Sequence, residues 1–128
     1  GEQSRDFVHV SDVARANRLA IESDVSDRAI NLGTGEPTSI REVASTLIDL
    51  YGRSDTLKPE IADDFRQGDI RHCYADVSAA RETLGFRAKV GFEEGLQEVV
   101  EWGRKQDPED NFDQAYSELR ENGLLDDE

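Results

Sequence analysis

The sequence has one cysteine, no basic run and no long apolar stretch, and each shortage excludes a class of protein. Cys73 is alone among 128 residues, so it cannot form an internal disulfide. No cluster of cysteine and histidine has the spacing of a zinc site. No stretch approaches the ~20 apolar residues of a membrane span, and the polar opening residues do not resemble a signal peptide. We therefore expect a protein of the reducing cytoplasm that holds no metal.

Positive charge is also scarce. The chain contains 29 acidic residues against 15 lysines and arginines, which gives a net charge of −14. Nucleic acids and anionic membrane surfaces both require a basic face on their partner. The charge therefore predicts that neither nucleic acid nor a membrane is a partner of this chain.

The charged residues are unevenly distributed. Only three of the 15 basic residues are lysines, and residues 106–128 hold nine acids and one arginine. An acid excess with few lysines is expected in a halophilic protein, since salt screens the self-repulsion. The alternative is an ordinary acidic protein with an acidic tail. Residues 106–128 are predicted to be an acidic extension, helical or partly disordered.

Hydrophobic periodicity predicts short strands that alternate with helices. Two β-prone runs at residues 7–10 and 29–32 are read as strands, and residues 72–75 as an extended segment. Apolar residues then recur at helical spacing in five segments. The predicted helices begin near Asp12, Ser39, Asp76, Phe92 and Phe112.

This order predicts a small α/β lobe, α+β-like in character, with four to five helices and few strands. So thin a sheet leaves helix faces that need a partner to cover them. Apolar residues make up only 36% of the chain, so the core should be modest. Residues 1–105 are therefore interpreted as one lobe of a larger protein.

Three motifs occur in a fixed order over residues 1–103. The first is Arg-Asp-Phe-Val-His-Val with Asp-Val following, at residues 5–13, and the second is Asn-Leu-Gly-Thr-Gly-Glu-Pro at 31–37. The third runs from Arg-Gln-Gly-Asp at 66–69 through Tyr-Ala-Asp to Phe-Glu-Glu-Gly-Leu at 92–96. Together they resemble the C-terminal part of the NAD-dependent epimerase/dehydratase family, extended short-chain dehydrogenase/reductases that act on nucleotide sugars.

This resemblance implies the C-terminal substrate lobe of an enzyme whose other half is an N-terminal Rossmann domain. In the family, NAD is retained and accepts a hydride transiently from the sugar C4. The Gly-rich fingerprint that cradles the cofactor is absent here. Tyr51, Tyr74 and Tyr116 lack the lysine four residues later that the family's catalytic motif requires. We expect NAD in the parent enzyme, no NAD on this chain, and no catalysis by this chain alone.

The resemblance also assigns candidate substrate-binding residues. Arg5 and Arg66 match the arginines that hold the diphosphate, a task suited to the guanidinium fork. Asp69 matches a carboxylate that accepts bonds from the ribose hydroxyls. Phe7 occupies an aromatic position near the nucleotide, and Gln3 is a further polar candidate at the same edge. The expected partners are a nucleotide-sugar substrate and the missing Rossmann domain.

Each candidate also has a purely structural interpretation. Arg5 could form a surface ion pair with Asp6, worth little. Arg66 and Asp69 could pair with each other and brace one loop. Phe7 is expected to serve core packing first.

Other polar and apolar residues are sufficiently explained by structure. His9 is read as a satisfied, partly buried histidine, and Asp12 and Asp76 as helix caps. Cys73 is expected to be a small buried residue, and Trp102 a core anchor. The Gly-Thr-Gly run at residues 33–35 is interpreted as a tight turn, because it lacks the Lys-Ser/Thr ending of a phosphate loop.

The sequence thus favours the nucleotide-sugar-binding part of a 4-epimerase-like enzyme. A 4,6-dehydratase or reductase lobe, or a non-catalytic binding or assembly module, is the alternative. Apolar surface that would face the Rossmann domain predicts self-association, with residues 7–10 or 29–32 as an exposed strand edge.

Overall fold

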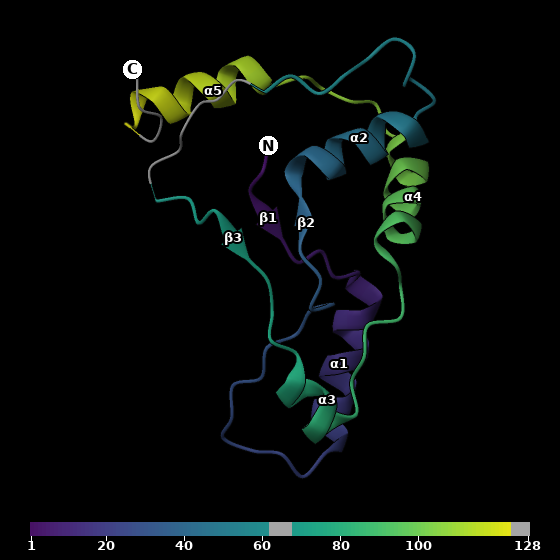
Figure 1. Cartoon of the computed structure of the whole chain (residues 1–128), viewed down its shortest axis with the longest axis vertical. Helices are drawn as coiled ribbons and strands as arrows, with labels where there is room; N and C mark the ends of the chain where they lie inside the picture. The colour runs from purple at the N-terminus through teal and green to yellow at the C-terminus, as the bar shows by residue number, and fades with distance from the viewer. Residues whose placement is uncertain (62–67, 124–128) are drawn as a thin grey trace.

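A short mixed sheet connects two groups of helices (Figure 1). The structure is a computed structural model that describes residues 1–61 and 68–123. Strands β1 (Ser4–Arg5), β2 (Thr38–Ser39) and β3 (His72–Cys73) form a sheet in the order β2-β1-β3. The central strand β1 is antiparallel to β2 and parallel to β3. Three segments far apart in sequence therefore meet at β1.

Residues 1–61 and 68–123 contain five helices besides this sheet, and the predicted small α/β fold with few strands is confirmed. They are α1 (Val10–Glu22), α2 (Ile40–Leu50), α3 (Ser78–Leu84), α4 (Phe92–Gly103) and α5 (Phe112–Glu121). Helices α1 and α3 pack together at one end, while α2 and α4 pack together at the other (Figure 1).

Local signals place the helix ends well. The Ser39 hydroxyl caps α2 by accepting from the Glu42 N–H at 3.1 Å, as the capping box predicts. Gly85 adopts a left-handed φ of 62° and ends α3 where the sequence places its end. The start of α1 differs, because His9 rather than Ser11 or Asp12 is its N-cap.

The two predicted strands are wrong. Residues 7–9 have no regular structure and Val10 already begins α1, while residues 29–32 form no ladder. Their β-prone side chains still find burial, since Ile30 and Leu32 pack against the core. β-propensity reports the fit to a half-buried surface, and here that surface is reached without strand pairing.

A small core lies between α1 and α3. Ala16, Ala80, Leu84 and Phe86 form one buried cluster, against which partly buried apolar residues pack. So few buried residues agree with the low apolar content. Two core predictions are wrong, because Cys73 is exposed at the outer strand β3 and Trp102 is 64% exposed near the end of α4.

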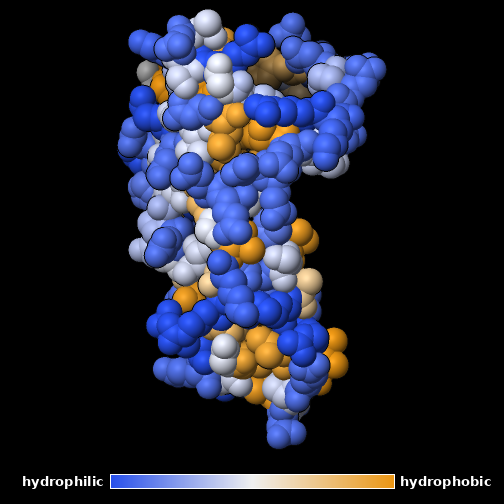
Figure 2. Space-filling view, turned by 90° about the vertical axis from the view of Figure 1, so that its right-hand side faces the viewer, coloured by the Kyte–Doolittle hydropathy of each residue, from blue (hydrophilic) through white to orange (hydrophobic). Residues whose placement is uncertain are grey.

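Apolar side chains also reach the surface. Figure 2 shows them as orange patches between hydrophilic areas. The exposed apolar residues include Phe7, which precedes α1, Val10, with which α1 begins, and Val99 and Trp102 on α4. No helix in the described ranges combines the length and the apolar character needed to cross a bilayer.

Candidate functional site

Parallel pairing of β1 with β3 brings two candidate residues together. Arg5 lies opposite Cys73 in this ladder, and Asp69 precedes β3 by three residues. The Arg5 Nη2 donates to Asp69 Oδ1 at 2.6 Å across 64 residues of sequence. The sequence suggested that Arg5 pairs with Asp6, its neighbour along the chain. The structure instead pairs Arg5 with Asp69, because the β1–β3 pairing brings these two segments together.

Arg5 is held in place and still has capacity for a ligand. Its Nη1 donates to the carbonyl oxygens of Ser4 at 2.8 Å and Arg71 at 3.3 Å. With the bond to Asp69, these described bonds use three of the five guanidinium N–H groups. The side chains of Arg5 and Asp69 are 30% and 42% exposed. The arrangement can therefore offer two N–H donors to an anionic group that approaches from solvent.

The remaining candidates are placed differently. Arg66 lies outside the described residues. Gln3 precedes β1, and its carbonyl oxygen accepts from Ile40 N at 3.0 Å. Phe7 packs against Phe92 with ring centroids 5.6 Å apart, at the start of α4. The structure thus brings together Arg5 and Asp69, and it directs Phe7 toward an apolar neighbourhood.

Asp6 has a structural role that sequence reasoning missed. Its carboxylate accepts from Thr34 N at 2.8 Å, Thr34 Oγ1 at 2.7 Å and Gly35 N at 2.9 Å. It also accepts from Ala75 N at 3.2 Å. These partners are 28 to 69 residues away, so local sequence gave no signal for them. The Gly-Thr-Gly run bends at Gly33 and Gly35, and the Asp6 carboxylate accepts from the backbone N–H groups of Thr34 and Gly35.

Asp12 joins α1 to the segment before α4. It is 2% exposed, and its Oδ2 accepts from Lys89 N at 2.8 Å and Val90 N at 3.0 Å. Its Oδ1 accepts from the Arg15 guanidinium. The interpretation of Asp12 as a helix cap is therefore wrong, because the side chain points to a distant backbone segment instead of the first turn of α1. Asp76 does act locally, by accepting from Ser78 N at 2.9 Å.

His9 is satisfied by structural partners, as expected. Its Nδ1 lies 2.7 Å from Ser11 Oγ, and its Nε2 lies 3.4 Å from Glu98 Oε2 on α4. Within the described part of the chain, no three histidine, cysteine, aspartate or glutamate side chains gather so that they could hold a metal ion.

The hydrogen bonds to Asp6 make its contribution to stability depend on pH. Burial opposes ionisation, but the bonds from Thr34, Gly35 and Ala75 outweigh it and lower the pKa below its ordinary 3.8. A carboxyl group whose pKa is lowered on folding stabilises the folded state to its full extent when the pH is above the pKa that the group has in the unfolded chain. That stabilisation is lost as the pH falls through the folded pKa.

We expect Asp6→Asn to lower the free energy of unfolding by about 1–3 kcal/mol at pH 7, the range for hydrogen bonds to a charged group. The difference from wild type should be smaller at pH 3, below the ordinary carboxyl pKa of 3.8, because the unfolded wild-type chain then gains free energy from a proton that the folded carboxylate binds less readily. Urea unfolding at both pH values measures it. Asp24→Asn, an exposed control, should show a small difference at pH 7. An Asp6→Asn effect of equal size at both pH values would contradict the prediction.

Comparison with known proteins connects this geometry to a family. The family model for GDP-mannose 4,6 dehydratase matches residues 1–99. UDP-glucose 4-epimerase of Caenorhabditis elegans is 33% identical over 110 residues, which are 82% of this chain and 31% of that protein. The chain thus spans about a third of the length of the curated relatives it matches.

Solved structures give the same relationship. UDP-glucose 4-epimerase of Thermotoga maritima with UDP-glucose is 38% identical, with a TM-score of 0.72 over 82% of this chain and 33% of that one. UDP-glucose 4-epimerase of Bifidobacterium longum with NAD+ and UDP is 30% identical, with a TM-score of 0.64 over 79% and 30% of the two chains. By the match over residues 1–99, supported by these relatives, the chain belongs to the NAD-dependent epimerase/dehydratase family.

Proposed function

We propose that this chain is the nucleotide-sugar-binding part of an NAD-dependent 4-epimerase-like enzyme. Residues 1–105 form the substrate lobe, and residues 106–128 form an acidic extension. The observation that carries the proposal is the Arg5–Asp69 ion pair, since it places a guanidinium of the central strand beside a carboxylate, and both side chains are partly exposed to solvent. Arg5 would bind a phosphate and Asp69 a ribose hydroxyl, with Arg66, Phe7 and Gln3 as further contacts.

The relatives support a nucleotide-sugar substrate. The Thermotoga maritima structure contains UDP-glucose, and the Bifidobacterium longum structure contains UDP. Both are named 4-epimerases, whereas the matching family model is that of a dehydratase. We favour the epimerase subclass because several curated relatives carry that name. A dehydratase or reductase remains the alternative within the family.

The Gly-Thr-Gly segment at residues 33–35 does not fit the pyrophosphate of NAD. A pyrophosphate at a strand-to-helix turn needs free backbone N–H groups. In this segment, the amide groups of Thr34 and Gly35 already donate to Asp6, whose carboxylate would also repel a phosphate. We therefore place NAD on a Rossmann domain outside this chain, and we derive no step through it.

The exposed apolar residues suit contact with such a domain. Phe7 and Phe92 line a cavity of about 260 Å³ together with Val10 and Val99, between the start of α1 and the face of α4. Apolar patches of this kind mark interaction surfaces. Self-association of the chain through the same surface stays a prediction, although the strand edges expected to mediate it do not form.

Removing Arg5 tests the proposed site. Arg5→Gln should weaken UDP binding by roughly tenfold or more, because a charge-assisted guanidinium–phosphate bond is lost. Asp69→Asn should also weaken UDP binding, because the ribose hydroxyls lose a carboxylate acceptor. Isothermal titration calorimetry with UDP at constant ionic strength measures both variants.

Arg18→Gln is the matched control. Arg18 is an exposed arginine on α1 that pairs with Glu22, so its loss changes the net charge equally but leaves the Arg5–Asp69 pair intact. It should bind UDP within twofold of wild type. Equal affinity of wild type and Arg5→Gln for UDP would argue against the proposed substrate site.

A further inference from the structure

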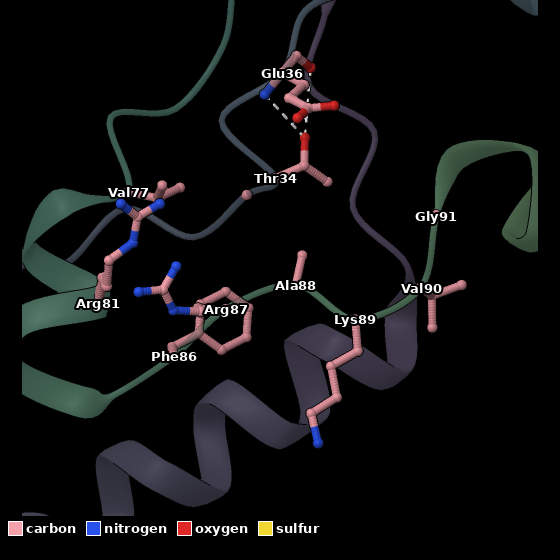
Figure 3. Close-up of a pocket in the computed structure, with 11 residues that line it drawn as sticks. Thr34, Glu36, Val77, Arg81, Phe86, Arg87, Ala88, Lys89, Val90 and Gly91 are labelled. Atoms are coloured by element: carbon pink, nitrogen blue, oxygen red, sulfur yellow. Dashed lines mark hydrogen bonds between the residues drawn. The ribbon is translucent and has the colours of Figure 1, made fainter.

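A second basic site lies away from the Arg5–Asp69 pair. A pocket of about 310 Å³ lies between α3, the segment that follows it and residues 33–36, and Figure 3 shows the residues that line it. Three cationic side chains line it, and they are Arg81, Arg87 and Lys89. The buried ring of Phe86, 1% exposed, also contributes to its wall. This volume falls near the lower end of the range for small-molecule sites.

The chain is built so that these cations gather. Arg81 lies in the last turn of α3, and the left-handed turn at Gly85 then reverses the chain. Arg87 and Lys89 follow within four residues of that turn. The Arg81 and Arg87 guanidinium groups consequently extend into the same region, whereas Lys89 points toward α1 (Figure 3).

Backbone contacts fix this segment in the absence of any ligand. The Arg15 guanidinium donates to the carbonyl oxygen of Arg87, and the buried Asp12 accepts from the N–H of Lys89. Arg15 also lies 4.9 Å from the centre of the Phe86 ring. The positions from which the Arg87 and Lys89 side chains start are therefore set by α1.

The electrostatics point to an anionic ligand. Although acids outnumber bases almost two to one, none of the described ion pairs involves Arg81, Arg87 or Lys89. Two guanidinium groups directed into one region repel each other unless an anion lies between them. Glu36 is the one acidic side chain among the lining residues, so the lining carries a net charge of +2.

We propose that this pocket binds a small phosphate-bearing molecule, with Arg81 and Arg87 as the principal contacts. Guanidinium groups bind phosphate oxygens through paired, charge-assisted hydrogen bonds. Lys89 also lines the pocket, but its side chain points toward α1 and is not among the principal contacts. The site goes beyond the proposed substrate site, because it uses α3 and the segment after it instead of β1 and β3.

Titration of the full chain with inorganic phosphate, at constant ionic strength, tests this. Arg81→Gln combined with Arg87→Gln should weaken phosphate binding at the pocket by at least about tenfold. The matched control is Arg18→Gln combined with Arg41→Gln, which removes two exposed arginines of other surfaces and gives the same net charge. The control should bind phosphate within about twofold of wild type. Glucose 1-phosphate, titrated in parallel, shows whether a phosphate ester binds more tightly than the free ion.

Backbone amide chemical shifts separate this site from the proposed substrate site. Phosphate should perturb residues 33–36 and 77–91 in wild type and in Arg5→Gln, but not in the Arg81/Arg87 double variant. Failure of UDP to bind at Arg5 leaves this result unchanged, so the two proposals fail separately. The proposal is overturned if the double variant retains wild-type affinity at these residues, or if the control variant loses as much affinity.

Discussion

Asp12→Ala is expected to lower the free energy of unfolding by about 3–5 kcal/mol, the range for breaking a buried charge pair. The carboxylate is buried and joins three groups, the N–H groups of Lys89 and Val90 and the Arg15 guanidinium. Its removal leaves two partly buried N–H groups without an acceptor and removes the carboxylate partner of Arg15. In a chain with so small a core, a loss of this size is a large part of the total stability.

Urea unfolding followed by circular dichroism measures this loss. Asp12→Asn keeps one acceptor oxygen and should show an intermediate loss, and it remains measurable if the alanine variant does not fold. Asp24→Ala removes the same charge from an exposed position and should change stability by less than about 0.5 kcal/mol. If Asp12→Ala resembled Asp24→Ala, the buried network would contribute little.

The helices could be predicted from sequence because their signals are local. The cap that Ser39 provides for α2 lies three residues from Glu42, and the glycine that ends α3 directly follows it. Both signals are contained within one or two helical turns. Even so, the predicted start of α1 is wrong. Aspartate is a common N-cap residue, but Asp12 lies inside α1 and accepts a hydrogen bond from Val90, 78 residues away.

Two of the three strands could not be predicted, because pairing defines them and composition does not, whereas β3 lies within residues 72–75, which the sequence predicts to be extended. Ser4 and Arg5 form the central strand although neither is β-prone, since β2 and β3 both pair with them. Ile30 and Leu32 are β-prone and form no strand. A sheet whose strands have two residues each has too little periodicity for a pattern to reveal.

The candidate site was predictable only in part, and by resemblance. Family motifs identified Arg5 and Asp69 separately, and the structure shows that they contact each other. The basic pocket at Arg81 and Arg87 was not predicted, because the two arginines flank a turn whose direction the sequence does not specify. Asp6 adjoins Arg5 and was considered only as its ion-pair partner, although its actual partners come from two distant segments.

Gly33→Ala should be the second strongly destabilising change, because the buried Gly33 leaves no room for a side chain. An added Cβ would lie 2.8 Å from the Ala75 Cβ and 2.9 Å from the Asp6 Cγ, and closer still to Asp6 Oδ2. These are short, well-anchored groups, so the Asp6 carboxylate would have to move away from the amides it binds. We expect a loss of about 2–4 kcal/mol, from overpacking and weakened hydrogen bonds together.

Gly91→Ala separates this steric effect from the general effect of replacing glycine. Gly91 has an ordinary φ of −69° and no atom within 4 Å of an added Cβ, so its replacement should change stability by less than about 1 kcal/mol. Adding Asp6→Asn to Gly33→Ala should cost less than Asp6→Asn costs in wild type, because the displaced carboxylate has already lost its partners. Urea unfolding of wild type, Gly33→Ala, Asp6→Asn and the double variant measures all four states of this double-mutant cycle. Additive losses would show that Gly33 and Asp6 act independently. They would refute the inference that a glycine is needed at position 33 to leave space for the Asp6 carboxylate.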